Sequence, residues 1–288
     1  MDDSEGGTIV GGAKLTRTQY LNTFIAVIST LLFLFPVFWM FITSLKPMNA
    51  LFTYPPEVVP ANPSFSAYIE NFVQNQVMLK YIGNSAIIAT GTMVLTLLLA
   101  IPCAYALARQ NIKGKGFILL ILLAVQMLPN IMLAMPLFIF FSKINLVNNF
   151  LALFIANTTH ALPFAILVLR PYFLSLPVGL EEAAQIDGCN KLSAFWRIIL
   201  PLVKPGIMTV GVFCFLWGWG DFLFALTLTT DESIRPLTLG LYKFIGEYGT
   251  AWNKLMAVAT IAAIPIILIF VTLQKYIIGG ITSGAMKD

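Results

Sequence analysis

The sequence carries little charge: Asp, Glu, Lys and Arg make up 10% of its 288 residues, whereas 58% are hydrophobic. Soluble domains contain about 25% charged residues, which cover their surface. This shortage excludes a soluble enzyme, a secreted scaffold and a disordered chain. The sequence therefore predicts an integral membrane protein.

Cysteine and histidine are also scarce, with three cysteines and the single histidine His160. The cysteines are far apart, and we expect reduced thiols that behave as small hydrophobic side chains. One histidine cannot by itself form a zinc or haem site. The net charge is +4, but no long basic tract indicates nucleic acid. We therefore predict neither a metal site nor a nucleic-acid partner.

Long apolar runs, by contrast, are frequent. A membrane-crossing helix needs about 20 mostly apolar residues, because each adds about 1.5 Å across a hydrocarbon core of about 30 Å. Alternating patterning typical of a membrane barrel is absent. We therefore predict an all-α membrane protein with six transmembrane helices, the first of which is an anchor rather than a cleaved signal peptide. The runs are 18–45, 81–108, 116–142, 144–169, 205–230 and 255–274.

The Lys and Arg residues predict the orientation, because cytoplasmic loops carry an excess of both. If both termini are cytoplasmic, 11 of the 17 lie inside and 6 outside. Trp39 and Trp252 then fall at outer helix ends, where aromatic residues are enriched. The expected organisation is a cytoplasmic tail (1–17), a transmembrane domain (18–278) with a cytoplasmic loop (170–204), and a second cytoplasmic tail (279–288).

The cytoplasmic loop shows two short helical patterns. Residues 176–188 predict a helix that begins with glutamates, which favour its positive N-terminal end, and that ends where Gly188 can adopt a left-handed conformation. A second helix over 193–200 is expected to end before Pro201. By these local features alone, the loop is an ordinary helix-turn-helix connection.

The spacing of particular residues within this loop is a more specific signal than its local helical patterns. It resembles the EAA loop of binding-protein-dependent ABC importer permeases, although Cys189 stands where that family usually has alanine. Other segments resemble the carbohydrate branch of the family, in particular the shorter, MalG-like subunit of maltose-type importers. Gly220 replaces the asparagine usual there, and residues 1–15 show no resemblance. The matching residues are Glu182-Ala183-Ala184, Asp187-Gly188, Phe195, Leu200-Pro201 and Pro205 in the loop, and 60–68, 219–223 and 274–285 elsewhere.

This resemblance implies the type I ABC importer permease fold in a prokaryotic plasma (inner) membrane, surrounded by lipid. The implied partners are a second, longer permease subunit, a cytoplasmic ABC ATPase dimer and an extracytoplasmic sugar-binding protein. The chain lacks a phosphate-binding loop, so ATP and Mg²⁺ would belong to the ATPase, and this chain would be neither an enzyme nor a cofactor carrier. The tail from Gly279 onward is a second, weaker candidate contact. The implied ATPase-coupling residues are Glu182, Ala183, Ala184, Asp187, Gly188 and Pro201.

Polar residues inside the runs are candidates for a substrate pathway, because sugar hydroxyls need hydrogen-bond partners near the bilayer middle. The simpler interpretation is hydrogen bonding between helices, and the sequence leaves both open. For Asp221 the simpler alternative is an interfacial or helix-packing acid. The candidates are Gln126, Asn130, Asn157, Thr158, His160 and Asp221.

Two classes of membrane protease are excluded by the sequence, and two other classes of transporter are not. The motif Gly218-Trp219-Gly220-Asp221 matches the pattern of intramembrane aspartyl proteases, but the second carboxylate that such catalysis needs is missing from the runs. A metalloprotease would need a H-E-x-x-H motif, which is absent. The favoured function is import of a di- or oligosaccharide. An ABC permease for a non-sugar solute and a secondary transporter remain as alternatives.

Overall fold

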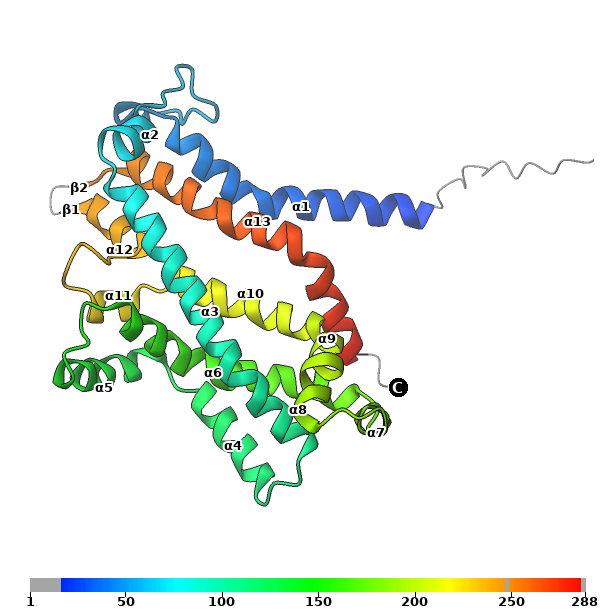
Figure 1. Cartoon of the computed structure of the whole chain (residues 1–288). Coiled ribbons are helices and arrows are strands. Elements are labelled where there is room, and N and C mark those ends of the chain that lie inside the picture. Colours follow the sequence, from blue (N-terminus) through cyan, green and yellow to red (C-terminus); the bar gives the residue numbers. More distant parts are fainter. Residues whose placement is uncertain (1–16, 247–248, 286–288) are drawn as a thin grey trace, which may run out of the picture.

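The computed structural model describes residues 17–246 and 249–285, and within them the chain is almost entirely helical (Figure 1). Residues 1–16 of the predicted N-terminal tail and residues 286–288 of the predicted C-terminal tail lie outside the described residues. Four helices are long and apolar enough to cross a membrane, which confirms the predicted all-α membrane fold. They are α1 (Arg17–Ser44), α3 (Val77–Arg109), α6 (Phe150–Ser175) and α13 (Trp252–Ala285, apolar to Gln274).

Two bent pairs of helices raise the number of candidate spans in the described residues to six. One pair is α4 (Lys115–Gln126) and α5 (Asn130–Lys143), which meet at 95°. The run 116–142 is therefore not one uninterrupted helix but two helices with a sharp bend between them. Pro129 precedes α5 in an extended conformation; proline has no amide hydrogen to continue a helix, and its ring clashes with the preceding turn.

The predicted run 205–230 is also divided. Helix α10 (Lys204–Gly220) ends before Asp221, and a short helix, α11 (Leu223–Leu228), follows. The Asp221 carboxylate accepts hydrogen bonds from the amides of Phe224 and Ala225, both at 3.1 Å. A side chain that caps the start of a new helix in this way favours an interruption at its own position.

The loop helices differ from expectation at Pro201. Helical conformation continues through α8 (Lys191–Ala194), η3 (Phe195–Ile199) and α9 (Leu200–Leu202), so the predicted end before Pro201 is wrong. The segment η3 is a wider π-helix. A π-helical turn changes the hydrogen-bond pattern directly before the proline, where an α-helix would otherwise need the missing amide hydrogen. This composite helix meets α10 at 74°.

Helix α3 forms the centre of the bundle, because it packs along both α6 and α10. Small residues allow this close approach, as is typical of membrane helices. A Cβ atom built on Gly218 of α10 would lie 2.8 Å from the Cα of Ala89 in α3. The core between α3 and α6 contains the fully buried alanines Ala100, Ala104, Ala161 and Ala165.

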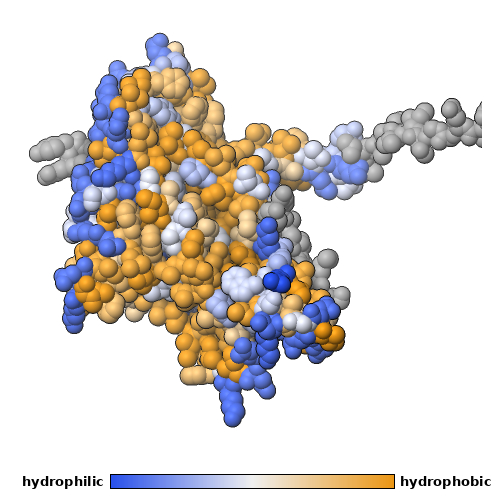
Figure 2. All heavy atoms as spheres, viewed as in Figure 1, coloured by the Kyte–Doolittle hydropathy of each residue, from blue (hydrophilic) through white to orange (hydrophobic). Residues whose placement is uncertain are grey.

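The two ends of the bundle are polar and the middle is apolar. Figure 2 shows hydrophobic residues over most of the visible face, with hydrophilic residues at its left edge and around α7 at the lower right. Helix α1 projects from the bundle with many exposed large apolar side chains. Such a surface is suited to contact with lipid or with another membrane subunit.

The end of the bundle opposite α7 contains short elements, and we call it the α12 end. Trp39 and Trp252 line the same cavity of about 250 Å³ there, so the two predicted interface tryptophans lie at one end. A two-residue antiparallel pair places Ile245 opposite Thr250. The elements are η1 (Met48–Ala50), α2 (Ser66–Tyr68), η2 (Ile69–Gln74), α12 (Leu237–Leu241), η4 (Tyr242–Phe244), β1 (Ile245–Gly246) and β2 (Gly249–Thr250).

Candidate functional site

The predicted coupling motif forms a short helix, α7 (Gly179–Ile186), that extends from the body of the bundle (Figure 1). Its first turn contains Glu181 and Glu182, whose charge favours the positive end of the helix. After the helix, Gly188 adopts a left-handed backbone with φ of +83°. This conformation strains any residue with a Cβ atom, and it turns the chain toward α8 as the sequence predicts.

The motif residues divide into an exposed set and a buried one. Ala184 is 2% exposed and anchors α7 to the rest of the loop. Glu182, Ala183, Asp187, Gly188 and Pro201 are all exposed. Ala184 therefore lies on the buried face of α7, and the other predicted coupling residues lie on an accessible surface.

Large apolar side chains lie among these exposed residues. Ile186 is 87% exposed and Trp196 is 57% exposed, and Leu192 is exposed as well. Exposed apolar groups beside carboxylates are typical of a surface that binds another protein. These three residues lie within or directly after the motif, but their exposure was not predicted from the sequence.

A charged contact joins the start of α7 to the last turn of α3. Arg109 Nε lies 3.1 Å from Glu181 Oε1, and the Tyr105 hydroxyl donates to Glu181 Oε2 at 3.2 Å. Arg109 Nη2 also donates to the carbonyl oxygen of Leu176 at 2.6 Å. None of these contacts was predicted, because the sequence does not show that residues more than 60 positions apart meet.

The comparisons with known proteins bear on this loop directly. The model of the family described as "Binding-protein-dependent transport system inner membrane component" matches residues 96–282, which include all of α7 and the loop after it. This match covers well over half of the chain. The chain belongs to that family.

Individual relatives extend the likeness over nearly all of this permease. It is 34% identical over 254 residues to the sulfoquinovosyl glycerol transport system permease protein SmoH of Agrobacterium fabrum, covering 88% of this chain and 89% of that one. It is 33% identical over 268 residues to the trehalose/maltose transport system permease protein MalG of Thermococcus litoralis, covering 91% and 94%. The chain is thus an ABC importer permease subunit rather than an enzyme, and a multi-pass protein of the plasma membrane.

A solved structure confirms the permease fold. The crystal structure of a bacterial ABC transporter involved in the import of the acidic polysaccharide alginate contains a chain with a TM-score of 0.76 and 24% sequence identity. The match covers 92% of this permease and 99% of that chain. The likeness supports the type I ABC importer permease fold.

Two of the six candidate pathway residues of the permease contact each other. Asn157 Nδ2 donates to Asp221 Oδ2 at 3.2 Å, which joins α6 to the start of α11. The neighbouring Thr158 hydrogen bonds with Thr96 of α3 at 3.2 Å. His160 packs edge-on against Trp217, with ring centroids 5.1 Å apart. These contacts are the interhelical type that the simpler interpretation expects.

Gln126 and Asn130 lie apart from that group, at the bend between α4 and α5. Gln126 Oε1 and Asn130 Oδ1 are buried and have no hydrogen-bond partner in the described structure. A buried carbonyl oxygen without a partner is costly. Both amides therefore keep an unused hydrogen-bond acceptor at the bend.

The described residues contain no group of three or more His, Cys, Asp and Glu side chains that could hold a metal ion. Cys214 is buried, Cys103 is exposed and Cys189 is partly exposed, and all three are free thiols.

Proposed function

We propose that this permease forms half of the translocation pathway of an ATP-driven importer of di- or oligosaccharides. Its partners would be a second, longer permease subunit, a cytoplasmic ABC ATPase dimer and an extracytoplasmic sugar-binding protein. Supporting this, relatives are named for trehalose/maltose and for sulfoquinovosyl glycerol transport. One solved neighbour is a complex with an alginate pentasaccharide-bound periplasmic protein.

The observation that carries the proposal is the exposed surface of α7. Glu182 and Asp187 offer carboxylates that can form charge-assisted hydrogen bonds with basic groups of a partner. Ile186 and Trp196 add apolar area beside them. This combination suits the groove of an ATPase subunit that grips α7 and moves it when ATP binds.

The remaining coupling residues support this interface in different ways. Ala183 has a small exposed side chain that permits close approach, and Gly188 permits the corner after the helix. Pro201 lies in the composite helix that leads into α10. A movement of α7 would therefore reach the membrane-spanning helix α10 through the corner at Gly188, the composite helix and the 74° bend that follows it.

The proposed orientation places the α7 end and both termini in the cytoplasm, and the α12 end outside. This agrees with the excess of Lys and Arg on the α7 side of the sequence-based topology. It also places Trp39 and Trp252 at the outer interface. The C-terminal tail 279–288 would then lie on the same side of the membrane as the ATPase.

The sugar class is supported by the polar groups of the predicted apolar runs, all of which are uncharged except Asp221. Amide oxygens of Gln126 and Asn130 lack partners, and sugar hydroxyls could supply them. Asn157, Thr158 and His160 of α6 are further candidates, as is Asp221 at the break after α10. A neutral solute needs no intramembrane cation to bind it.

Sugar uptake into proteoliposomes tests this function. The permease pair and its ATPase are reconstituted, the binding protein is added, and uptake of a panel of labelled disaccharides and oligosaccharides is measured with and without ATP. Uptake of at least one sugar that requires both ATP and the binding protein is expected. ATP-dependent uptake of amino acids or phosphate alone would favour a non-sugar permease, and ion-driven uptake without ATP would favour a secondary transporter.

A further inference from the structure

The contact between α7 and α3 is concentrated on one carboxylate. Glu181 receives both the Arg109 ion pair at 3.1 Å and the Tyr105 hydrogen bond at 3.2 Å. The side chains of Arg109 and Glu181 are only 10% and 20% exposed, so the ion pair is largely shielded from water. A shielded pair of this kind is expensive to break by removing one partner.

Much of the remaining space between these elements is empty. A cavity of about 500 Å³ separates the end of α3 from α7 and α8. Its lining includes Pro102, Tyr105, Arg109, Glu181 and Phe195. Glu181 is therefore the residue of α7 whose side chain makes polar contacts with α3, beside the apolar contact of Leu180 with the core cluster that includes Leu107.

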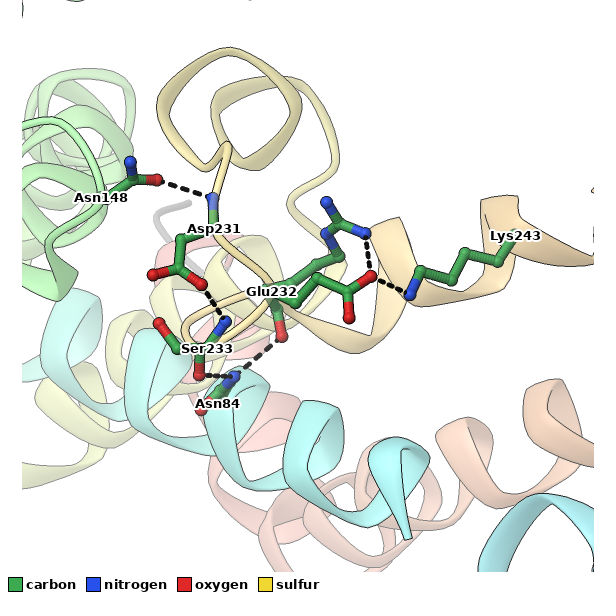
Figure 3. Close-up of polar contacts among 7 residues, drawn as sticks. Asn84, Asn148, Asp231, Glu232, Ser233 and Lys243 are labelled. Atoms are coloured by element: carbon green, nitrogen blue, oxygen red, sulfur yellow. Dashed lines mark hydrogen bonds and ion pairs between the residues drawn. The ribbon is translucent and has the colours of Figure 1, made fainter. Parts of the chain in front are cut away.

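The opposite end of α3 is tied to a different segment, the loop 229–236 between α11 and α12. Asn84 Nδ2 donates to the carbonyl oxygens of Ser233 at 3.0 Å and Arg235 at 2.9 Å (Figure 3). The Ser85 hydroxyl accepts a hydrogen bond from the Leu237 amide at 2.9 Å. Asn84 and Ser85 are both buried, so α3 satisfies two carbonyl groups of that loop and the first amide of α12.

Helix α3 is long enough to connect the two segments across a bilayer. Asn84 and Arg109 are 25 positions apart, about 38 Å at 1.5 Å per residue, which exceeds a hydrocarbon core of about 30 Å. Between them, fully buried Ala100 and Ala104 pack against α6. One continuous helix thus contacts the coupling helix at one end and the loop 229–236 at the other.

We propose that α3 transmits movement between α7 and the loop 229–236, with Glu181 as the positioning residue that holds α7 to α3. The inference rests on the proposed function, because it takes α7 as the ATPase contact and the loop 229–236 as part of the outer face. Arg109 and Tyr105 act through Glu181. Asn84 and Ser85 perform the same task at the outer end.

Charge exchange in the full importer tests the inner connection. Arg109→Glu, Glu181→Arg and the double exchange are compared in proteoliposomes that contain the partner permease, ATPase and binding protein. Each single variant is expected to reduce the ratio of binding-protein-stimulated to basal ATP hydrolysis by about 5- to 20-fold, within the usual range of coupling between sites. The double exchange restores much of the ratio, and the binding-protein concentration for half-stimulation does not change.

Lys113→Glu is the matched control, because Lys113 is exposed in the turn between α3 and α4 at the same end. It is expected to leave the stimulation ratio at the wild-type value.

If the charge exchanges prevent assembly, Glu181→Gln and Tyr105→Phe retain the shape of the contact, and each is expected to lower the ratio. An unchanged ratio in assembled Arg109→Glu or Glu181→Gln complexes overturns the inference. A wild-type complex that shows no ATP-dependent uptake would instead contradict the proposed function.

Discussion

Asn157 and Asp221 are 64 positions apart and meet across two helices, with Asn157 Nδ2 donating to Asp221 Oδ2 at 3.2 Å. The same carboxylate accepts hydrogen bonds from the amides of Phe224 and Ala225 at the start of α11. The single acid within the predicted runs thus ends one helix, begins another and holds both to α6.

Asp221→Ala removes these three hydrogen bonds, whereas Asp221→Asn retains an oxygen that can cap α11. Loss of a helix cap costs about 1 to 2 kcal/mol. We expect Asp221→Ala to lower the thermal unfolding midpoint of the detergent-solubilised complex and Asp221→Asn to remain close to the wild type. Equal midpoints for Asp221→Ala and the wild type would show that the cap contributes no stability.

Gly218 and Gly220 differ sharply in their surroundings. A Cβ atom on Gly218 would lie 2.8 Å from the Ala89 Cα, and backbone atoms cannot move aside cheaply, whereas a Cβ atom on Gly220 meets nothing within 4 Å. Gly218→Ala is expected to destabilise the complex by about 1 to 3 kcal/mol through overpacking. Gly220→Ala serves as its control and should unfold at the wild-type temperature. The account of the α3–α10 contact fails if both variants unfold alike.

Gly188 is left-handed with a φ of +83°, although a Cβ atom there would find open space. Gly188→Val therefore adds backbone strain of about 1 to 2 kcal/mol without a steric clash. We expect this variant to retain no more ATPase during purification than Glu182→Ala does. Gly179→Ala is the matched control, since Gly179 lies in α7 without positive φ and with open space around it. Full retention of ATPase by Gly188→Val would contradict the role of the corner.

The loop 229–236 should show a pH dependence through Glu232. The hydrogen bond from Lys243, together with the charges of Lys243 and Arg235, lowers the pKa of Glu232 below its ordinary value of 4.5, against the charge of Asp231, which raises it (Figure 3). A group whose pKa is lower in the folded state contributes stability above its ordinary pKa and loses it as the pH falls through the folded pKa. Glu232→Gln is thus expected to lower the unfolding midpoint at pH 7.

That difference should begin to shrink as the pH falls below about 4.5, where Glu232 of the unfolded chain binds a proton, and it should disappear once the pH is below the lowered pKa of Glu232 in the folded state. The contact is exposed, so high salt should also reduce the difference at pH 7. Unfolding midpoints of the wild type and Glu232→Gln, measured from pH 7 to pH 3, check both expectations. A difference that stays constant over the whole range would exclude a contribution from the Glu232 charge.

Composition was sufficient to predict the class of fold, and the resemblance of one loop to the EAA loop was sufficient to predict a coupling loop. Low charge, six long apolar runs and the spacing from Glu182 to Pro201 are local features that are read directly from the chain. The family match confirms that class, and the corner at Gly188 has the predicted conformation. Residue roles within the coupling loop stay predictions.

The breaks within the runs could not be predicted from apolar character alone. Pro129 and Asp221 interrupt predicted spans, because one lacks an amide hydrogen and the other caps a new helix. Tertiary contacts were equally inaccessible: nothing local to Arg109 or Asn84 shows that their partners are Glu181 and Ser233. Asn148 is another example, since its side chain accepts from the amides of Thr230 and Asp231 in a different loop.

The central claim is that α7 attaches this permease to an ATPase, and co-purification tests it most directly. The chain is tagged, native membranes are solubilised gently, and the proteins retained by the wild type, Glu182→Ala and the exposed control Lys113→Ala are identified. We predict that the wild type and the control retain a second permease and an ATPase, and that Glu182→Ala retains the permease but loses the ATPase. Recovery of the chain alone, or an ATPase retained equally by Glu182→Ala, would contradict the account.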